Sequence, residues 1–388
     1  MRDHVGLGGN GQMLKNITNN GFTRLVLIFV FWMAIAKLMA EMFDYKYLVD
    51  GGFDIGLLML LTIVEFAAPA LLAAIIKQNE SKKFVIIGAA IRIIAFLALI
   101  YWKGLPGAMI YFILTSLTNV LFWVPFNIAY FRKQHERSAF VSAVYYNVGP
   151  MLGIVLPVLG GALIEGVSFE SLFLLMVAGY ILWLISVIKF WPDERQDIDI
   201  RAELKKLKGM KTLLFAESGY ASAAMLGIPL VTILYFQKPS ELGLVASAMS
   251  IVAVAFSFMF AKISDKTKER MKYLVPFAIF LGLAMIASVL AYDAVTWFVI
   301  LVIMTIGRVL FFPFTTTILM DNQQKPEEVM YGRELVLNVG RVFWMAVIYI
   351  IYATTNSLQI GIAVCGLGMI IYPFAARLKE KEGHIELS

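Results

Sequence analysis

The sequence predicts an all-α polytopic membrane protein whose twelve transmembrane helices form two parallel six-helix halves. Of the 388 residues, 60% are apolar and 15% are charged, whereas a soluble domain has about 45–50% apolar and about 25% charged residues. Apolar stretches of about 20 residues, the length that crosses a bilayer, recur along the whole chain. Short motifs in the first six stretches also return in the last six, which indicates an internal duplication.

Composition excludes several other classes of protein. The single cysteine, Cys365, lies in an apolar stretch, and the three histidines, His4, His135 and His384, lie in polar segments. These residues provide no disulfide framework, and we expect no metal site and no bound cofactor. The net charge of +6 is typical of basic loops beside a membrane, and we expect no nucleic-acid partner. The first 22 residues have no apolar core and do not resemble a cleaved signal peptide.

Twelve spans follow from apolar length, read in order along the chain. Glycine and proline inside several of them are compatible with membrane helices, and the strict alternation of a membrane β-barrel does not occur. The predicted spans are 23–44, 53–77, 84–102, 107–131, 139–164, 172–191, 212–237, 241–263, 273–293, 295–319, 335–354 and 356–376.

The distribution of basic residues predicts the orientation. Only Lys46, Lys103 and Lys238 fall in connections that follow odd-numbered spans, and four basic residues fall inside spans and away from their ends. The others lie in the termini, in the connections that follow even-numbered spans, or at the span ends beside these. The positive-inside rule therefore places both termini in the cytoplasm of a multi-pass protein of the cell membrane.

The longest connection divides the chain almost in half. It separates an N-terminal half (23–191) from a C-terminal half (212–377), with tails at 1–22 and 378–388. Within this linker (192–211), Ile200, Leu204 and Leu207 have helical spacing, with acidic residues before them and lysines after them. This pattern favours a short helix on the inner membrane surface; a solvated linker is the alternative.

Three pairs of segments carry the repeat, each between one span or loop and its equivalent six spans later. The pairs are Asn119–Phe126 with Arg308–Phe314, Asn147–Pro150 with Asn338–Arg341, and Ala74–Lys83 with Ala261–Arg270. Six spans return the chain to its starting side, so the two halves have the same orientation. Parallel halves with a binding site between them at the membrane midplane are a known plan of transporters.

These features resemble the major facilitator superfamily. The loops after spans 2 and 8 are similar to that family's Gly-x-Leu-x-Asp-Arg-x-Gly-Arg-Lys signature and its echo. The first loop departs from the signature, with Gln78 in place of the acidic residue, and the second keeps that residue as Asp265. The resemblance implies that the loops hold one conformation closed, through residues that we assign to gating: Gln78, Lys82, Lys83, Asp265, Lys266 and Arg270.

A second resemblance lies in span 5. Pro157, Gly160 and Gly161 are similar to the Gly-Pro-x-x-Gly-Gly element of the family's exporters, although Leu156 replaces the first glycine. The resemblance favours export and adds these three residues to the gating set. The alternative is that they only bend the helix and allow close packing. The arginine that the family carries in span 4 is absent, and Arg308 of span 10 occupies the equivalent place in the repeat.

Seven charged residues fall inside spans and away from their ends, where a charge costs about 2.5–3.5 kcal/mol. We expect the carboxylates Glu41, Glu65 and Glu217 to be candidates for proton coupling. The cations Lys37, Arg308 and Arg341 are candidates for binding an anionic group of the substrate. Structural pairing is the alternative, with Lys37 neutralising Glu41 and Arg92 neutralising Glu65. For Arg92 we favour the structural interpretation.

Uncharged side chains on the same spans can contribute stacking surface and amide groups to a ligand site. The candidates are Asn119, Trp123, Asn127, Tyr145, Asn147, Tyr220 and Asn338. Taken singly, each of them is more often an ordinary packing residue than a ligand contact. Trp102, Trp191 and Trp297 lie at span ends, which is typical of the aromatic belt at the membrane interface.

The sequence therefore predicts a secondary active transporter that moves a small organic solute by alternating access. A proton gradient is the expected energy source, an anionic or zwitterionic substrate is favoured, and export by an antiporter is favoured over import. We expect a monomer in the lipid bilayer and no enzymatic activity. The alternatives are multidrug-type efflux of lipophilic compounds and a non-transporting receptor or lipid-handling protein with the same fold.

Overall fold

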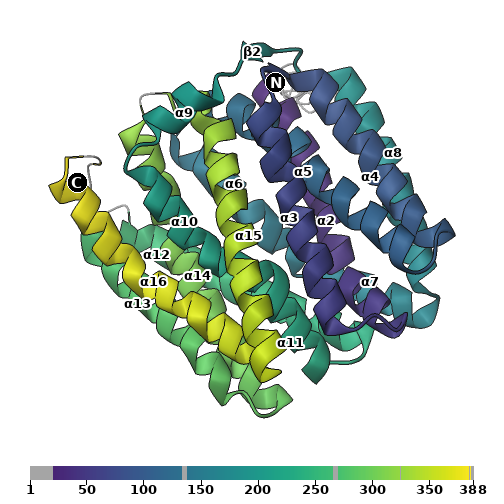
Figure 1. Ribbon diagram of the computed structural model, residues 1–388. Helices are drawn as coiled ribbons and strands as arrows, with labels where there is room; N and C mark the ends of the chain where they lie inside the picture. Colours follow the sequence, from purple (N-terminus) through teal and green to yellow (C-terminus); the bar gives the residue numbers. More distant parts are fainter. Residues whose placement is uncertain (1–20, 133–137, 265–269, 324, 384, 386–388) are drawn as a thin grey trace, which may run out of the picture.

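The computed structural model describes residues 21–132, 138–264, 270–323, 325–383 and 385. Within them, twelve helical segments are long and apolar enough to cross a membrane, as the sequence predicts. They stand side by side in one bundle (Figure 1), with the linker elements at one end. We call the end that carries Gly21, the linker and Lys381 the terminal face, and the other end the opposite face.

The described residues of the N-terminal half form seven helices and one short strand. The helices are α2 (Gly21–Asp50), α3 (Ile55–Ile75), α4 (Ser81–Tyr101), α5 (Leu105–Arg132), α6 (Ser138–Gly153), α7 (Leu156–Gly166) and α8 (Phe169–Phe190). The first helix continues six residues beyond its predicted end, so Lys46 lies within α2, where it pairs with Asp50. The predicted fifth span is divided into α6 and α7.

The C-terminal half has the same plan. Its elements are α10 (Met210–Ser222), the π-helix η2 (Ala223–Gly227), α11 (Ile228–Tyr235), α12 (Pro239–Ser264), α13 (Arg270–Ile286), the 3₁₀ turn η3 (Ala287–Leu290), α14 (Ala294–Asn322), the 3₁₀ turn η4 (Pro326–Val329), α15 (Met330–Thr355) and α16 (Leu358–Lys381). The predicted seventh span thus contains a π-helical turn, a feature that is frequent at functional sites.

Short polar side chains start four of the helices that enter from the opposite face. Asp54, Ser168, Asp293 and Ser357 are the N-caps of α3, α8, α14 and α16, and each accepts a hydrogen bond from a backbone N–H in the first turn. A cap satisfies amide groups that have no partner within the helix. These residues explain why the tight turns on this face end where they do.

Glycines allow the two halves to approach closely where α7 crosses α12. A Cβ atom on Gly161 would lie 2.4 Å from the carbonyl oxygen of Pro239, and one on Gly243 would lie 2.4 Å from that of Pro157. A Cβ on Gly160 would lie 2.1 Å from the carbonyl oxygen of Leu38 within the N-terminal half. The structure therefore gives the glycines of the Pro-x-x-Gly-Gly element a packing role.

The interfacial-belt interpretation is wrong for two of the three tryptophans. Trp191 and Trp297 are 3% and 0% exposed, and their indole N–H groups donate to the hydroxyls of Ser81 and Thr232. A tryptophan at a helix end can be buried instead of lying in the membrane interface when its indole N–H has a hydrogen-bond partner. Trp102 is exposed, as a belt residue would be.

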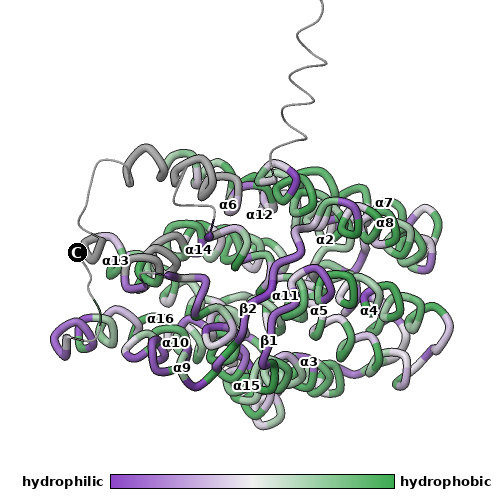
Figure 2. The backbone as a smooth tube through the Cα atoms, turned by 90° about the horizontal axis from the view of Figure 1, so that it is seen from above, coloured by the Kyte–Doolittle hydropathy of each residue, from purple (hydrophilic) through white to green (hydrophobic). Residues whose placement is uncertain are grey.

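The linker folds into two elements that differ from the rest of the molecule. Strand β2 (Arg195–Asp197) pairs antiparallel with β1 (Gln78–Glu80), which lies between α3 and α4. The helix α9 (Ile200–Lys206) follows and has Asp199 as its N-cap. Figure 2 shows hydrophilic residues gathered at these elements, whereas hydrophobic residues cover most of the helices around them.

Candidate substrate-transport site

A cavity of about 130 Å³ lies between the two halves. The N-terminal half contributes Lys37, Ala40 and Met42 of α2 and Pro157 of α7. The C-terminal half contributes side chains of α10, α11, α12 and α14, including Tyr220, Thr232, Met249, Thr305 and Arg308. A pocket that both halves line changes its shape when the halves move relative to each other, as a transport site must.

Arg308 is the distinctive residue of this cavity. It is half-buried on α14, and it forms no hydrogen bond or ion pair with the described part of the chain. The other charged residue among the described lining is Lys37, also a cation. A cation without a protein partner in a membrane-embedded cavity attracts an anionic ligand, because charges at this depth need compensation.

The remaining cavity wall is mainly apolar. Tyr220 is 5% exposed and packs against Phe312 of α14, with 5.3 Å between the ring centroids. Met42, Met249 and Met304 line the same space, and methionine side chains adapt to ligands of irregular shape. The site thus combines positive charge with a deformable apolar surface.

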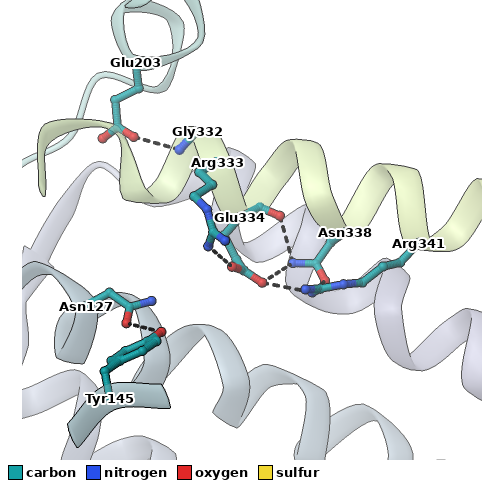
Figure 3. Close-up of polar contacts among 8 residues, drawn as sticks. All are labelled: Asn127, Tyr145, Glu203, Gly332, Arg333, Glu334, Asn338 and Arg341. Atoms are coloured by element: carbon teal, nitrogen blue, oxygen red, sulfur yellow. Dashed lines mark hydrogen bonds and ion pairs between the residues drawn. The ribbon is translucent and has the colours of Figure 1, made fainter. Parts of the chain in front are cut away.

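Arg341 and Asn338 do not line this cavity and instead belong to a polar network on α15 (Figure 3). The Arg341 guanidinium donates to Glu334 Oε1 at 3.0 Å and to Asn338 Oδ1 at 2.8 Å, and Asn338 Nδ2 donates to Glu334 Oε1 at 3.1 Å. Arg333 lies 4.0 Å from the other Glu334 oxygen. These groups are one another's partners, although the buried Nε of Arg341 has no hydrogen-bond partner among the described residues. Arg341 also lies over the Phe66 ring of the N-terminal half.

Arg333 and Glu334 were absent from the sequence-based candidates. The eleventh span was predicted to begin at residue 335, whereas α15 begins at Met330. Glu334, Asn338 and Arg341 have the i, i+4, i+7 spacing of one helix face. That spacing is the signal that could have found the network.

Glu217 of α10 faces the same network from the neighbouring helix. It is 6% exposed and interacts electrostatically with Arg333 and Arg341, while the nearby Thr315 hydroxyl of α14 donates to the carbonyl oxygen of Phe312. Two arginines and two glutamates therefore balance one another in the C-terminal half. Such a balance suits a site that gains or loses a proton.

The predicted Glu65–Arg92 pair is wrong as a direct contact. Arg92 donates to the carbonyl oxygen of Thr115 at 3.3 Å, and its guanidinium lies 5.5 Å and 5.7 Å from the ring centroids of Phe96 and Tyr180. Aromatic faces are alternative partners for a buried cation. Glu65, half-buried on α3, still interacts electrostatically with Arg92, but without a hydrogen bond or an ion pair within 4 Å.

Asp44 of α2 is a second carboxylate in that region that the sequence reading missed. The hydroxyl of Tyr111 on α5 donates to it at 3.3 Å. Asp44 is the last residue of the predicted first span. Because α2 continues to Asp50, Asp44 lies within the helix and faces the bundle.

The uncharged candidates of the N-terminal half gather on α5 and α6. The Tyr145 hydroxyl donates to Asn127 Oδ1 at 3.1 Å (Figure 3), and Tyr145 interacts electrostatically with Arg333 and Glu334 across the interface. Trp123 packs edge-on against Phe29, with 5.9 Å between the ring centroids. Asn119 and Asn147 are half-buried on the same two helices.

The predicted gating residues are placed only in part. Gln78 of β1 donates to Asp197 Oδ1 at 3.2 Å, Lys83 pairs with Glu80 at 3.0 Å, and Lys82 is half-buried in the first turn of α4. Asp265 and Lys266 lie outside the described residues. The side chains of Arg270 and of Glu41, the proton-coupling candidate of α2, also lie outside the description.

Two parallel groups of six spans with a cavity between them define a membrane transporter fold. A model of the Major Facilitator Superfamily matches residues 17–330. The chain belongs to the major facilitator superfamily, as its loop motifs and repeat indicate.

Solved structures share this fold over nearly the whole chain. A POT family transporter in complex with a thioalcohol-conjugated peptide aligns with a TM-score of 0.67 and 12% identity, covering 93% of this chain and 96% of its own. A POT family transporter in complex with 5-aminolevulinic acid aligns with a TM-score of 0.66 and 11% identity, covering 97% and 98%. At such identities the likeness concerns the fold. The search of curated proteins found no sequence relative.

Proposed function

We propose that this protein is a secondary active transporter of a small organic anion or zwitterion. The observation that carries the proposal is Arg308, a half-buried cation without a partner in the described part of the chain, in a cavity that both halves line. An anionic group of the substrate binds beside Arg308 and Lys37. Its apolar body lies against Tyr220 and the methionines.

Alternating access follows from the position of the cavity. Rocking of the two halves exposes Arg308 first to one side of the membrane and then to the other. We place both termini in the cytoplasm, because basic residues gather in the terminal-face connections. The protein works as a monomer in the cell membrane, and the Pro157-Gly160-Gly161 element favours export.

Proton movement is the proposed energy source, and Glu217 is its best-placed carboxylate. It lies on α10 and faces α15, beside two arginines. Protonation of Glu217 would remove one of the negative charges that balance these arginines. Glu65 and Glu41 are further candidates on α3 and α2. Exchange of each of the three for glutamine tests the role; intact pH-dependent transport in all three variants contradicts it.

The substrate class is tested by thermal stability of the purified chain with a library of anions, zwitterions and lipophilic cations. A ligand that binds the folded state raises the melting temperature by mass action. We expect a shift with an anion or zwitterion that Arg308→Ala abolishes. Arg377→Ala, at an exposed position of α16, is the matched control. Uptake of the same compound into proteoliposomes then tests transport.

The second candidate is efflux of lipophilic cations, which the methionine- and aromatic-lined wall of the cavity favours. A stability shift that only lipophilic cations produce, and that survives Arg308→Ala, would replace the anion proposal with this one.

A further inference from the structure

The linker forms a strap across the terminal face, with one end attached to each half. On the N-terminal side, β2 is paired with β1, and Arg132 at the end of α5 binds Glu194 at 2.8 Å. The Ser81 N–H also donates to the Glu194 carbonyl oxygen. On the C-terminal side, α9 contacts η4 and α15. Only Ile198 and Asp199 separate β2 from α9, so the strap has little slack.

Three polar contacts fasten α9 to the C-terminal half. Glu203 Oε2 accepts a 2.7 Å hydrogen bond from the backbone N–H of Gly332 in the first turn of α15 (Figure 3). Lys206 forms a 2.8 Å ion pair with Glu328 of η4, and Gln323 Nε2 donates to the carbonyl oxygen of Lys206. Leu207 is fully buried beside them.

Glu203 differs from the other two polar fasteners because its side chain is buried. The residue is 5% exposed, although it belongs to a short helix at the end of the bundle. Burial disfavours its charged form, whereas the hydrogen bond from Gly332 favours that form. Burial has the larger effect and raises the pKa of the Glu203 carboxyl to about 7.

The surroundings of Glu203 are a polar cavity of about 450 Å³ on the terminal face. Charged side chains from three parts of the chain line this cavity. They are Asp197, Asp199 and Lys206 of the linker, Arg132 of α5, and Lys325, Glu327 and Glu328 of the η4 segment. Tyr331 of α15 is the neighbouring phenol. The cavity therefore gives water and protons a route to the carboxyl when α9 loosens.

We propose that the linker strap holds the terminal face closed and that protonation of Glu203 fastens it. The inference rests on the proposed alternating-access function, because opening of the terminal face moves the halves apart and requires α9 to leave η4 and α15. A free glutamate has a pKa of 4.5 and the docked one of about 7. Rising pH therefore weakens docking, by up to roughly two orders of magnitude between these values.

The test measures the distance between spin labels on the full-length chain in lipid nanodiscs, without substrate, from pH 5 to pH 8.5. Lys189→Cys in the last turn of α8 and Lys381→Cys at the end of α16 provide exposed label sites on the two halves. Cys365 is buried and is replaced by alanine. We expect a longer-distance population that grows as the pH rises through about 7.

Two variants separate titration from docking. Glu203→Gln keeps the shape without the charge, and we expect it to retain the shorter distance at every pH. Gly332→Ala adds a Cβ atom 3.0 Å from the Glu203 Cβ, and we expect it to give the longer distance even at pH 5. Glu165→Gln, at an exposed position near the opposite-face end of α7, is the matched control and should behave as the parent.

The outcomes are distinct. A constant distance in the parent, or a pH-dependent change that Glu203→Gln retains, overturns the strap proposal. One fixed distance in every variant, including Gly332→Ala, contradicts the proposed movement of the halves as well. Failure of Arg308→Ala to change ligand binding would concern only the substrate class.

Discussion

The hydroxyl of Tyr45 on α2 donates a 2.9 Å hydrogen bond to the carbonyl oxygen of Met225 in the π-helix η2. The bond joins the two halves on the side of the bundle toward the opposite face, and the same hydroxyl lies 2.9 Å from Thr62 of α3. The strap joins the halves at the other end. Contacts between the halves thus occur at the strap and also beside the cavity, which Ala224 next to Met225 lines.

The first prediction concerns this bond. Tyr45→Phe removes the hydroxyl and leaves the ring, so the change should cost about 0.5–1.5 kcal/mol of the contact between the halves. We expect a larger population open toward the opposite face, measured as faster labelling of a cysteine introduced at Ser250 in the cavity wall. Tyr101→Phe, at a 72% exposed position, should label at the parental rate; equal rates in both variants would contradict the role of Tyr45.

The second prediction concerns the crossing of α7 and α12. Gly161→Ala forces a Cβ atom toward the backbone of Pro239, and overpacking of this kind costs about 1–3 kcal/mol. We expect a lower melting temperature and lower transport. Gly166→Ala in the same helix is the control, since nothing lies within 4 Å of its added Cβ atom. Because alanine favours a helix more than glycine does, a melting temperature reduced equally in both variants would show that the crossing with Pro239 is not responsible.

The third prediction concerns the α15 network. Glu334→Gln leaves Arg341 without its carboxylate partner in a half-buried place. Breaking a fully buried pair costs about 3–5 kcal/mol, so we expect a smaller loss here. Arg341→Met in the same chain removes the uncompensated charge, so the double variant should recover part of the lost stability. A double-mutant cycle on melting temperature measures the coupling. The more exposed Lys379–Glu382 pair should show almost none; additive effects at Glu334 and Arg341 would refute the network.

The fourth prediction is a pH dependence of stability that comes from Glu203. Its carboxyl has a pKa of about 7 in the folded chain and 4.5 as a free side chain. Between these values the folded state binds more protons than the unfolded state, so the free energy of unfolding falls as the pH rises.

Glu203→Gln has no such titration. Its melting temperature should match that of the parent near pH 4.5 and exceed it at pH 8, with the difference developing through the window between the two pKa values. Other titrating groups cancel in this comparison. A difference that is the same at all pH values would mean that the Glu203 carboxyl does not change its proton affinity on folding.

Spans and family follow from local properties of the sequence. Apolar length determines where a helix can cross the bilayer, because unpaired backbone groups are too costly in lipid. The loop residues around Gln78 and Asp265 and the repeated Asn119 and Arg308 segments indicated the duplicated plan. These properties belong to single segments, and no knowledge of neighbouring helices is needed to read them.

The interaction partners of the charged residues could not be predicted from such local properties. Lys37 and Arg308 lie far apart in the sequence but line one cavity, whereas Arg341 is bound to Glu334 and Arg92 turns to Thr115 and aromatic rings. Hydropathy also ended span 1 too early and began span 11 too late, because it scores each polar residue as if it faced lipid. Asp44 and Glu334 face other helices instead.

The sequence by itself determined that the chain spans the membrane twelve times in two related halves, because hydrophobic length and repetition are local signals. Tertiary structure alone decided that Arg308 has no partner among the described residues, that Glu203 is buried against Gly332, and that the linker pairs with the loop after α3. The physical reason is that helix rotation and the fold of a polar linker depend on which surfaces meet. Which charges compensate one another in a low-dielectric interior depends on the distances between them, and the packing of those surfaces determines these distances.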